Sequence, residues 1–166
     1  MTVTVYGGNF LLLGVANVWD RRKGLDDFIR LRASLPEDVS VLLVGLTAKQ
    51  IRLLPKGIIG IGRTESIEEL AWIYAAADLF VNASVEETFG LTTVESLACG
   101  TPAVVYRSTA CPELITPNVG FVVEPGNIED IVQKTLVVRE QGKSFYTGFC
   151  RQHAVEHFRI FKRSFK

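Results

Sequence analysis

The sequence predicts an α/β fold built on a parallel sheet. Continuously apolar runs of strand length alternate along the chain with longer stretches in which apolar residues recur at helical spacing. This alternation is typical of a parallel sheet with helices on both faces. The chain has 166 residues, of which 48% are hydrophobic, and this is enough for one domain with a buried hydrophobic core. We therefore expect a single domain over residues 1–166, a Rossmann-like three-layer sandwich with a sheet of about six parallel strands.

The elements follow in order from these patterns and from the turn residues between them, such as the Pro-Glu-Asp segment at 36–38. The predicted strands are Phe10–Val15, Val39–Val44, Ile58–Ile61, Leu79–Asn82, Ala103–Tyr106 and Gly120–Val123. Helical periodicity predicts helices at residues 25–33, 48–53, 67–76, 90–99, 128–140 and 144–158. No internal repeat and no low-complexity linker interrupts this order.

Composition and charge exclude several classes of protein. Eighteen basic and eighteen acidic residues cancel, which argues against a general nucleic-acid binder. Three cysteines without framework spacing indicate a reducing compartment. No run reaches the roughly 20 apolar residues of a membrane span. The N-terminal segment lacks the basic-then-apolar order of a signal peptide, and we expect a cytoplasmic protein.

The most informative segment spans residues 84–102. It follows the predicted strand Leu79–Asn82 and places Glu87 and Glu95 eight positions apart, across a loop and the first turns of a helix. Ligands of open parallel sheets bind at the carboxyl ends of the strands, which is where these polar groups gather. Thr88 is predicted to be the N-cap of the helix, because its side-chain oxygen can accept from a backbone N–H of the first turn.

The start of this helix has the properties of an anion site. Backbone N–H groups at the positive end of the helix dipole would come from Phe89, Gly90, Leu91 and Thr92. Gly90 has no side chain, so a ligand can approach the backbone closely. Glu95 could accept hydrogen bonds from two vicinal sugar hydroxyls. Acidic residues near a helix start are also favoured by the dipole alone, so the residues by themselves leave both interpretations open.

The segment resembles the signature of the family 4 glycosyltransferases. Their C-terminal half carries a Glu, seven intervening residues and a second Glu, followed by a small-Gly-Thr-Pro turn. Glu87, Glu95 and the Cys-Gly-Thr-Pro turn at 99–102 match this pattern in register. The family usually has Gly after the first Glu, where this chain has Thr88. Other segments resemble the family in the expected order, so that the resemblance covers nearly the whole chain: residues 14–26, 68–78, 111–115 and 120–127.

The resemblance implies the donor-binding half of a retaining, metal-independent enzyme with two facing Rossmann-like domains. Glu95 would bind the ribose hydroxyls of a nucleotide-diphospho-sugar, and Glu87 would face the sugar as the catalytic residue. No cofactor and no metal are implied, and a UDP-sugar is favoured over a GDP-sugar as the donor. The family's N-terminal acceptor domain has no counterpart in this sequence. The domain is therefore expected to bind nucleotide but to transfer little or nothing alone.

A basic run follows the first predicted strand. Arg21, Arg22 and Lys23 would open on the same edge of the sheet as the helix start, where cations could meet a diphosphate, although a solvated basic turn is the simpler interpretation. Family members use a Lys at this place for the donor phosphates, so the resemblance assigns this role to Lys23, with Arg22 beside it. The family's usual Arg at the preceding strand end is absent, and Asn17 lies near its place. Arg63 follows the third strand, where the family seats the base.

Two further segments carry patterns of other functions. His153 and His157 have the H-x-x-E-H spacing of one class of zinc peptidases and would share a helical face. A surface helix with two incidental histidines is the simpler interpretation. Near the C-terminus, Phe158, Phe161 and Phe165 fall on one helical face among basic residues. Such an end could make a peripheral membrane contact, whereas in related enzymes the C-terminal helix packs on the other domain.

Two alternatives come from other classes of protein. A sugar-nucleotide epimerase has a similar two-half architecture and would release a changed sugar nucleotide without needing an acceptor. A binding or scaffold module would keep the fold without the chemistry. The presence of both Glu87 and Glu95 argues against such a decayed site.

Overall fold

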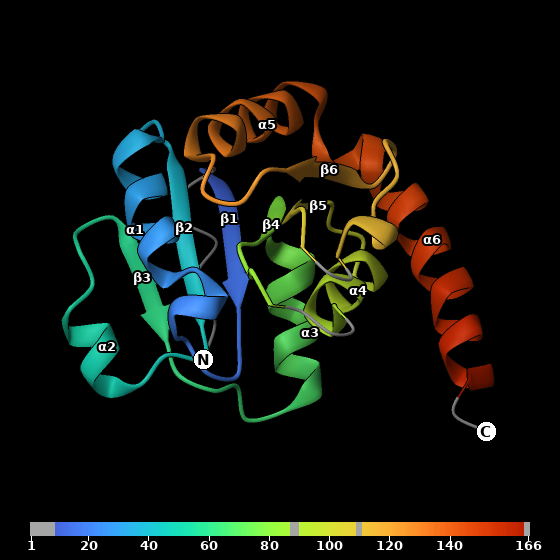
Figure 1. Cartoon of the computed structure of the whole chain (residues 1–166), viewed down its shortest axis with the longest axis horizontal. Coiled ribbons are helices and arrows are strands. Elements are labelled where there is room, and N and C mark those ends of the chain that lie inside the picture. Colours follow the sequence, from blue (N-terminus) through green and yellow to red (C-terminus); the bar gives the residue numbers. More distant parts are fainter. Residues whose placement is uncertain (1–8, 87–89, 109–110, 165–166) are drawn as a thin grey trace.

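The computed structural model describes residues 9–86, 90–108 and 111–164 and confirms the α/β architecture (Figure 1). All six predicted strands are present with the predicted bounds. They are β1 (Phe10–Val15), β2 (Val39–Val44), β3 (Ile58–Ile61), β4 (Leu79–Asn82), β5 (Ala103–Tyr106) and β6 (Gly120–Val123). The strand bounds follow from the sequence because each mostly apolar run ends at or within two residues of a turn-forming or polar residue.

The six predicted helices are present, α3 with the predicted bounds and the other five with bounds shifted by one to six residues. They are α1 (Leu25–Ser34), α2 (Ala48–Arg52), α3 (Ile67–Ala76), α4 (Leu91–Ala98), α5 (Ile128–Gln141) and α6 (Lys143–Ser164). Two short 3₁₀ helices, η1 (Arg21–Lys23) and η2 (Cys111–Leu114), were not predicted. Side-chain caps define three of the helix starts: Thr47, Ser66 and Asn127 each accept from a backbone N–H three residues later.

The sheet is fully parallel, with the strand order β3-β2-β1-β4-β5-β6. Strands β1 and β2 pair along their whole length, from Phe10 opposite Val39 to Val15 opposite Val44. On its other side β1 pairs with β4, Leu12 lying opposite Leu79. Because the order reverses at β1, right-handed crossovers place α1 and α2 on one face of the sheet and α3 and α4 on the other.

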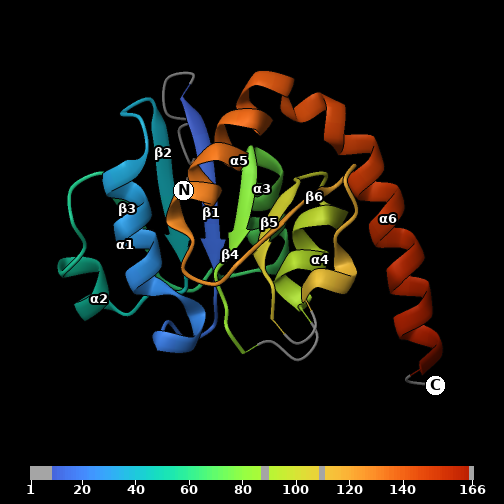
Figure 2. The ribbon, with the colours of Figure 1, turned by 45° about the horizontal axis from the view of Figure 1, so that its top comes forward.

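The remaining helices complete these two layers. Helix α5 returns to pack against α1, and α6 packs along α4. Figures 1 and 2 both show α6 running beside α4, with the C-terminal end of α6 extending away from the sheet. In the described part of the chain, no helix has both the length and the apolar character of a membrane span.

The core lies on both faces of the central strands, as continuous apolar strands require. Leu12 and Leu13 of β1 and Leu79 and Phe80 of β4 have no exposed surface. Because these strands are rigidly packed, the loops at their carboxyl ends have a fixed support.

Candidate functional site

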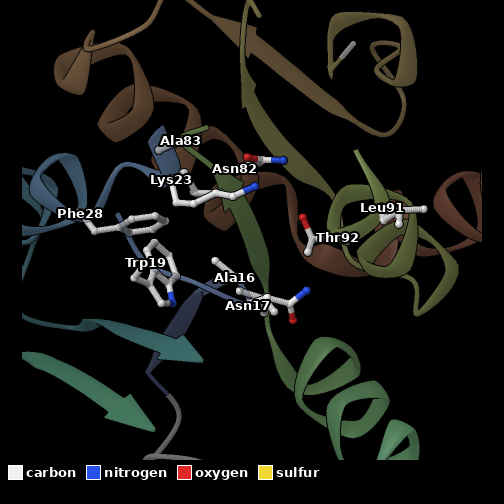
Figure 3. Close-up of a pocket in the computed structure, with 11 residues that line it drawn as sticks. Ala16, Asn17, Trp19, Lys23, Phe28, Asn82, Ala83, Leu91 and Thr92 are labelled. Carbon is white, nitrogen blue, oxygen red and sulfur yellow. The ribbon is translucent and has the colours of Figure 1, made fainter. Parts of the chain in front are cut away.

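A cleft opens at the carboxyl edge of the sheet between β1 and β4 (Figure 3). This is the point at which the strand order reverses, and ligands of doubly wound sheets bind at such a switch point. The cleft has a volume of about 190 Å³. Its polar lining comes from Asn17, Lys23, Asn82 and Thr92, and its apolar lining includes Trp19, Phe28 and Leu91.

Four of the residues predicted to bind substrate meet in this cleft. Asn17 follows β1, Lys23 ends η1, and Leu91 and Thr92 begin α4. Their convergence follows from the topology, because the loops after β1 and β4 leave neighbouring strands at the same edge of the sheet. The predicted juxtaposition of the basic turn and the helix start is therefore confirmed.

The wall of the cleft beside Lys23 is aromatic and anchored to the sheet. The rings of Trp19 and Phe28 meet edge to face with centroids 5.4 Å apart. The indole Nε1 of Trp19 donates to the backbone oxygen of Val44, 2.9 Å away, at the end of β2. Figure 3 shows the Lys23 side chain passing above these rings toward Asn82. This packing gives the half-buried Lys23 a defined direction across the mouth of the cleft.

Hydrogen bonds and one close backbone contact hold η1 and Gly24, together called the Lys23 turn, against the end of β4. Asp20 caps η1 by accepting from the backbone N–H of Arg22 at 2.9 Å. The backbone N–H of Val85 donates to the Arg22 oxygen, also at 2.9 Å. Gly24 follows in the left-handed conformation, with φ 81°, and an added Cβ there would lie 2.5 Å from the Ala83 backbone oxygen. Only glycine allows the turn to approach β4 this closely.

Arg22 lies beside the cleft but is engaged with carboxylates. Its guanidinium pairs with Asp20 at 2.9 Å and with Glu86 at 3.7 Å. The hydrogen bond to Asp20 is the main cause that raises the pKa of Arg22. Both pairs are solvent-exposed, so they contribute little to stability and a phosphate could compete for the same guanidinium. The assignment of Arg22 to the diphosphate stays a prediction.

The start of α4 differs from the prediction. The helix begins at Leu91 rather than at Gly90, and its N-cap is Gly90 in the left-handed conformation, with φ 60° and ψ 36°. The predicted N-cap role of Thr88 is therefore wrong, because glycine makes the turn into the helix without a side-chain cap. The first amides of α4 have no partner within the helix. Because Leu91 and Thr92 line the cleft, this positive helix end faces it.

Sequence reasoning missed the polar link between β4 and α4. Asn82 ends β4 and is only 7% exposed, and its amide Nδ2 donates to the Thr93 hydroxyl at 3.0 Å. The Asn82 oxygen accepts from the backbone N–H of Ser84 at 3.1 Å. These bonds fix α4 relative to the strand end. A polar residue at the end of an otherwise apolar strand at the switch point is the signal that could have revealed this role.

Glu95 lies further along α4 and is not among the described residues that line the cleft. Although it is exposed as a residue, its Oε2 accepts from the buried Tyr74 hydroxyl at 2.9 Å. Loss of hydration raises the pKa of the Glu95 carboxyl, and the Tyr74 hydrogen bond partly offsets this effect. The carboxylate is thus held by a partner that the sequence analysis did not identify.

The other predicted residues either do not line the cleft or lie outside the described residues. Arg63 is exposed after β3, and β2 separates β3 from β1 in the sheet. Glu87 and Phe89 lie outside the described residues, so their predicted roles stay predictions.

The two histidines of α6 contact each other, and His153 also contacts η2. The rings of His153 and His157 lie with centroids 4.3 Å apart, and His153 Nε2 lies 2.8 Å from the Leu114 backbone oxygen of η2. Within the ranges that the structure describes, no three His, Cys, Asp or Glu side chains form a group that could hold a metal ion. The side chains of the predicted apolar face of the tail, at Phe158, Phe161 and Phe165, lie outside the described part of the chain.

The fold and the cleft define a Rossmann-like domain whose candidate site combines a cation, a helix N-terminus and an aromatic wall at the switch point. The family model described as "Glycosyl transferases group 1" matches residues 9–140. The chain therefore belongs to the group 1 glycosyl transferases.

Individual relatives agree with this family. D-inositol 3-phosphate glycosyltransferase from Mycobacterium sp. (strain KMS) is 30% identical over 152 residues, covering 84% of this chain and 34% of that protein. A GDP-mannose-dependent alpha-(1-6)-phosphatidylinositol dimannoside mannosyltransferase from Mycobacterium tuberculosis (strain ATCC 25177 / H37Ra) is 51% identical over 51 residues, or 31% of this chain and 13% of that protein. The crystal structure of Anabaena HepE in complex with UDP superimposes with a TM-score of 0.75 at 25% identity, covering 89% of this chain and 44% of HepE. The chain spans less than half the length of each of these relatives.

Proposed function

We propose that this chain binds a nucleotide-diphospho-sugar in the cleft between β1 and β4 and supports retaining, metal-independent transfer of the sugar. The observation that carries the proposal is the meeting of Lys23, Asn17 and the start of α4 at the switch point. A lysine and a helix N-terminus that face one cleft form a fitting site for a diphosphate. The glycosyltransferase names of the relatives and the UDP in the HepE complex support this class of ligand.

We assign the phosphate and ribose contacts to backbone groups at the start of α4 and to three side chains. The backbone of Phe89, Gly90, Leu91 and Thr92 holds the sugar and the phosphates. Lys23, with Arg22, offsets the negative charge that develops on the leaving diphosphate, which is the main catalytic contribution that this domain can make. This charge compensation supports a reaction without a metal ion. Glu95 accepts hydrogen bonds from the ribose hydroxyls.

The remaining roles concern the sugar, the base and the edge of the phosphate site. Glu87 faces the sugar as the catalytic residue. Asn17 contacts the phosphates from the end of β1, and Arg63 lies on the side of the base. We favour a uracil nucleotide over a guanine nucleotide, and the HepE complex with UDP, which covers 89% of the chain, supports this choice.

Transfer requires an acceptor, and we propose that an N-terminal acceptor-binding domain supplies it. The matched relatives are more than twice as long as the regions they share with this chain, which is compatible with such a partner domain. The three cysteines without framework spacing support a cytoplasmic location. The basic, apolar C-terminal tail supports a peripheral contact with a membrane surface.

Calorimetric titration of the chain with UDP, GDP and ADP tests this function. We expect saturable binding of one nucleotide, with UDP favoured, and strong loss of binding in Glu95→Ala. A control variant, Arg107→Ala, removes an exposed ion pair with Glu124 after β5 and should bind like the wild type. Absence of binding for all three nucleotides would contradict the proposal.

A further inference from the structure

Tyr74 connects α3 to the carboxylate of Glu95. The Tyr74 side chain is 1% exposed and packs edge to face against Phe80 of β4, with ring centroids 5.7 Å apart. Its hydroxyl donates to Oε2 of Glu95 at 2.9 Å. Burial, followed by the Glu95 charge, raises the pKa of Tyr74, so the phenol keeps its proton and acts as the donor.

The backbone of Tyr74 is held by the turn that follows α4. The Thr101 hydroxyl donates to the Tyr74 backbone oxygen at 2.5 Å. Ser96, the neighbour of Glu95 on α4, donates from its hydroxyl to the Thr101 backbone oxygen at 2.9 Å. Ser96 and Thr101 have no exposed surface. Three hydrogen bonds and the peptide bond between Glu95 and Ser96 join these four residues in a closed ring that links α3, α4 and the Cys-Gly-Thr-Pro turn.

Such a ring fixes the orientation of a flexible side chain before a ligand arrives. A glutamate has several rotatable bonds, and ordering them during binding lowers affinity. With Oε2 held by Tyr74, the carboxylate still has lone pairs on both oxygens to accept from ligand hydroxyls. We propose that Tyr74 is a positioning residue that orients Glu95 toward the ribose hydroxyls, and that Thr101 holds Tyr74 in place. The inference rests on the nucleotide-binding function proposed above.

Removal of the Tyr74 hydroxyl tests this role with a matched control. Tyr106→Phe is the control, because Tyr106 is also 1% exposed and its hydroxyl donates to a carboxylate oxygen of Asp27 on α1 at 2.7 Å. Both variants lose a buried phenol-to-carboxylate hydrogen bond, but only Tyr74 contacts Glu95. Each is titrated calorimetrically with UDP and GDP and with their 2′,3′-dideoxy analogues, and thermal unfolding checks that each is folded.

The expected result is selective for the ribose hydroxyls. Tyr74→Phe should weaken UDP binding by roughly tenfold, in line with loss of a hydrogen bond to a charged group. It should leave binding of the dideoxy analogue unchanged, because that ligand offers Glu95 no hydroxyl. Tyr106→Phe should bind both ligands like the wild type. Thr101→Val should reproduce the pattern with a smaller loss, and Thr101→Ser, which keeps the hydroxyl, should restore wild-type binding.

Two outcomes would overturn the inference while leaving the proposed function in place. In the first, Tyr74→Phe weakens binding of UDP and of its dideoxy analogue by the same factor, which would make Tyr74 a fold-stabilising residue only. In the second, Glu95→Gln loses the preference for the ribose hydroxyls while Tyr74→Phe keeps it. Failure of the wild-type chain to bind any of the nucleotides would overturn the proposed function, and this inference with it.

Discussion

Replacement of Gly24 by alanine tests whether the Lys23 turn depends on its close approach to β4. Gly24 has φ 81°, and an added Cβ would lie 2.5 Å from the oxygen and 2.6 Å from the Cβ of Ala83. A left-handed non-glycine residue costs about 1–2 kcal/mol. A clash with a packed backbone adds about 1–3 kcal/mol. The free energy of unfolding should therefore fall by about 2–5 kcal/mol.

Gly126 provides a control that separates these two contributions. Its φ is 80°, but no heavy atom lies within 4 Å of an added Cβ. Gly126→Ala should therefore carry only the backbone cost of about 1–2 kcal/mol. For a chain of this size, about 1 kcal/mol corresponds to roughly 2–4 °C in Tm. We expect Gly24→Ala to melt well below Gly126→Ala.

Urea unfolding and UDP titration of the two variants provide the assay. Displacement of the turn should also move Lys23, so Gly24→Ala should weaken UDP binding whereas Gly126→Ala should not. Equal losses of stability in the two variants would refute the reasoning, because the contact with Ala83 would then contribute nothing. Unchanged UDP affinity in a destabilised Gly24→Ala would show that the turn does not position Lys23.

Three further predictions concern charge and burial. Lys23→Met should weaken UDP binding by about tenfold and reduce the dependence of binding on salt, with little change in Tm. Titrations at two ionic strengths would check this, and an unaltered affinity would exclude a phosphate-binding role for Lys23. Loss of hydration around its carboxyl raises the pKa of Glu95, so the folded state holds this proton more tightly than the unfolded chain. Wild-type stability should therefore fall as pH rises from about 4.3, the pKa in the unfolded chain, through the higher pKa of the folded state. Glu95→Gln should lack this fall in urea unfolding between pH 4 and 7, and parallel profiles would contradict the assignment. Burial raises the pKa of the Cys150 thiol to about 12, and its side chain has no exposed surface, so iodoacetamide at pH 8 should modify it only after unfolding. Mass spectrometry would show this, and labelling of native Cys150 as fast as that of Cys99 would count against it.

The sheet could be predicted from local patterns because its strands are buried on both faces. Each strand is a mostly apolar run, with Ser40 in β2 and Asn82 at the end of β4 as polar members, so its bounds are visible without knowledge of its neighbours. The helix start at α4 was harder to predict. Thr88 and Gly90 both suit a helix start by composition, and the choice between them depends on the left-handed backbone of Gly90, which only the folded chain shows.

The candidate site was predictable in part. Lys23 and Thr92 meet because parallel strands release their loops at one edge, and this follows from the predicted sheet. The partners of individual side chains did not follow. The pairing of Arg22 with Glu86 and the hydrogen bond from Tyr74 to Glu95 join residues from different elements, and no local pattern encodes such distances.

The sequence by itself determined the six strands, the helices between them and the loops that carry the polar residues, because these depend on local periodicity and on turn chemistry. It also showed which residue types were available for a phosphate and a sugar. The tertiary structure decided which of them meet. The right-handed crossovers placed the cleft between β1 and β4, and side-chain packing between α3 and α4 gave Glu95 its buried partner, because contacts between distant segments are set by the packing of whole elements.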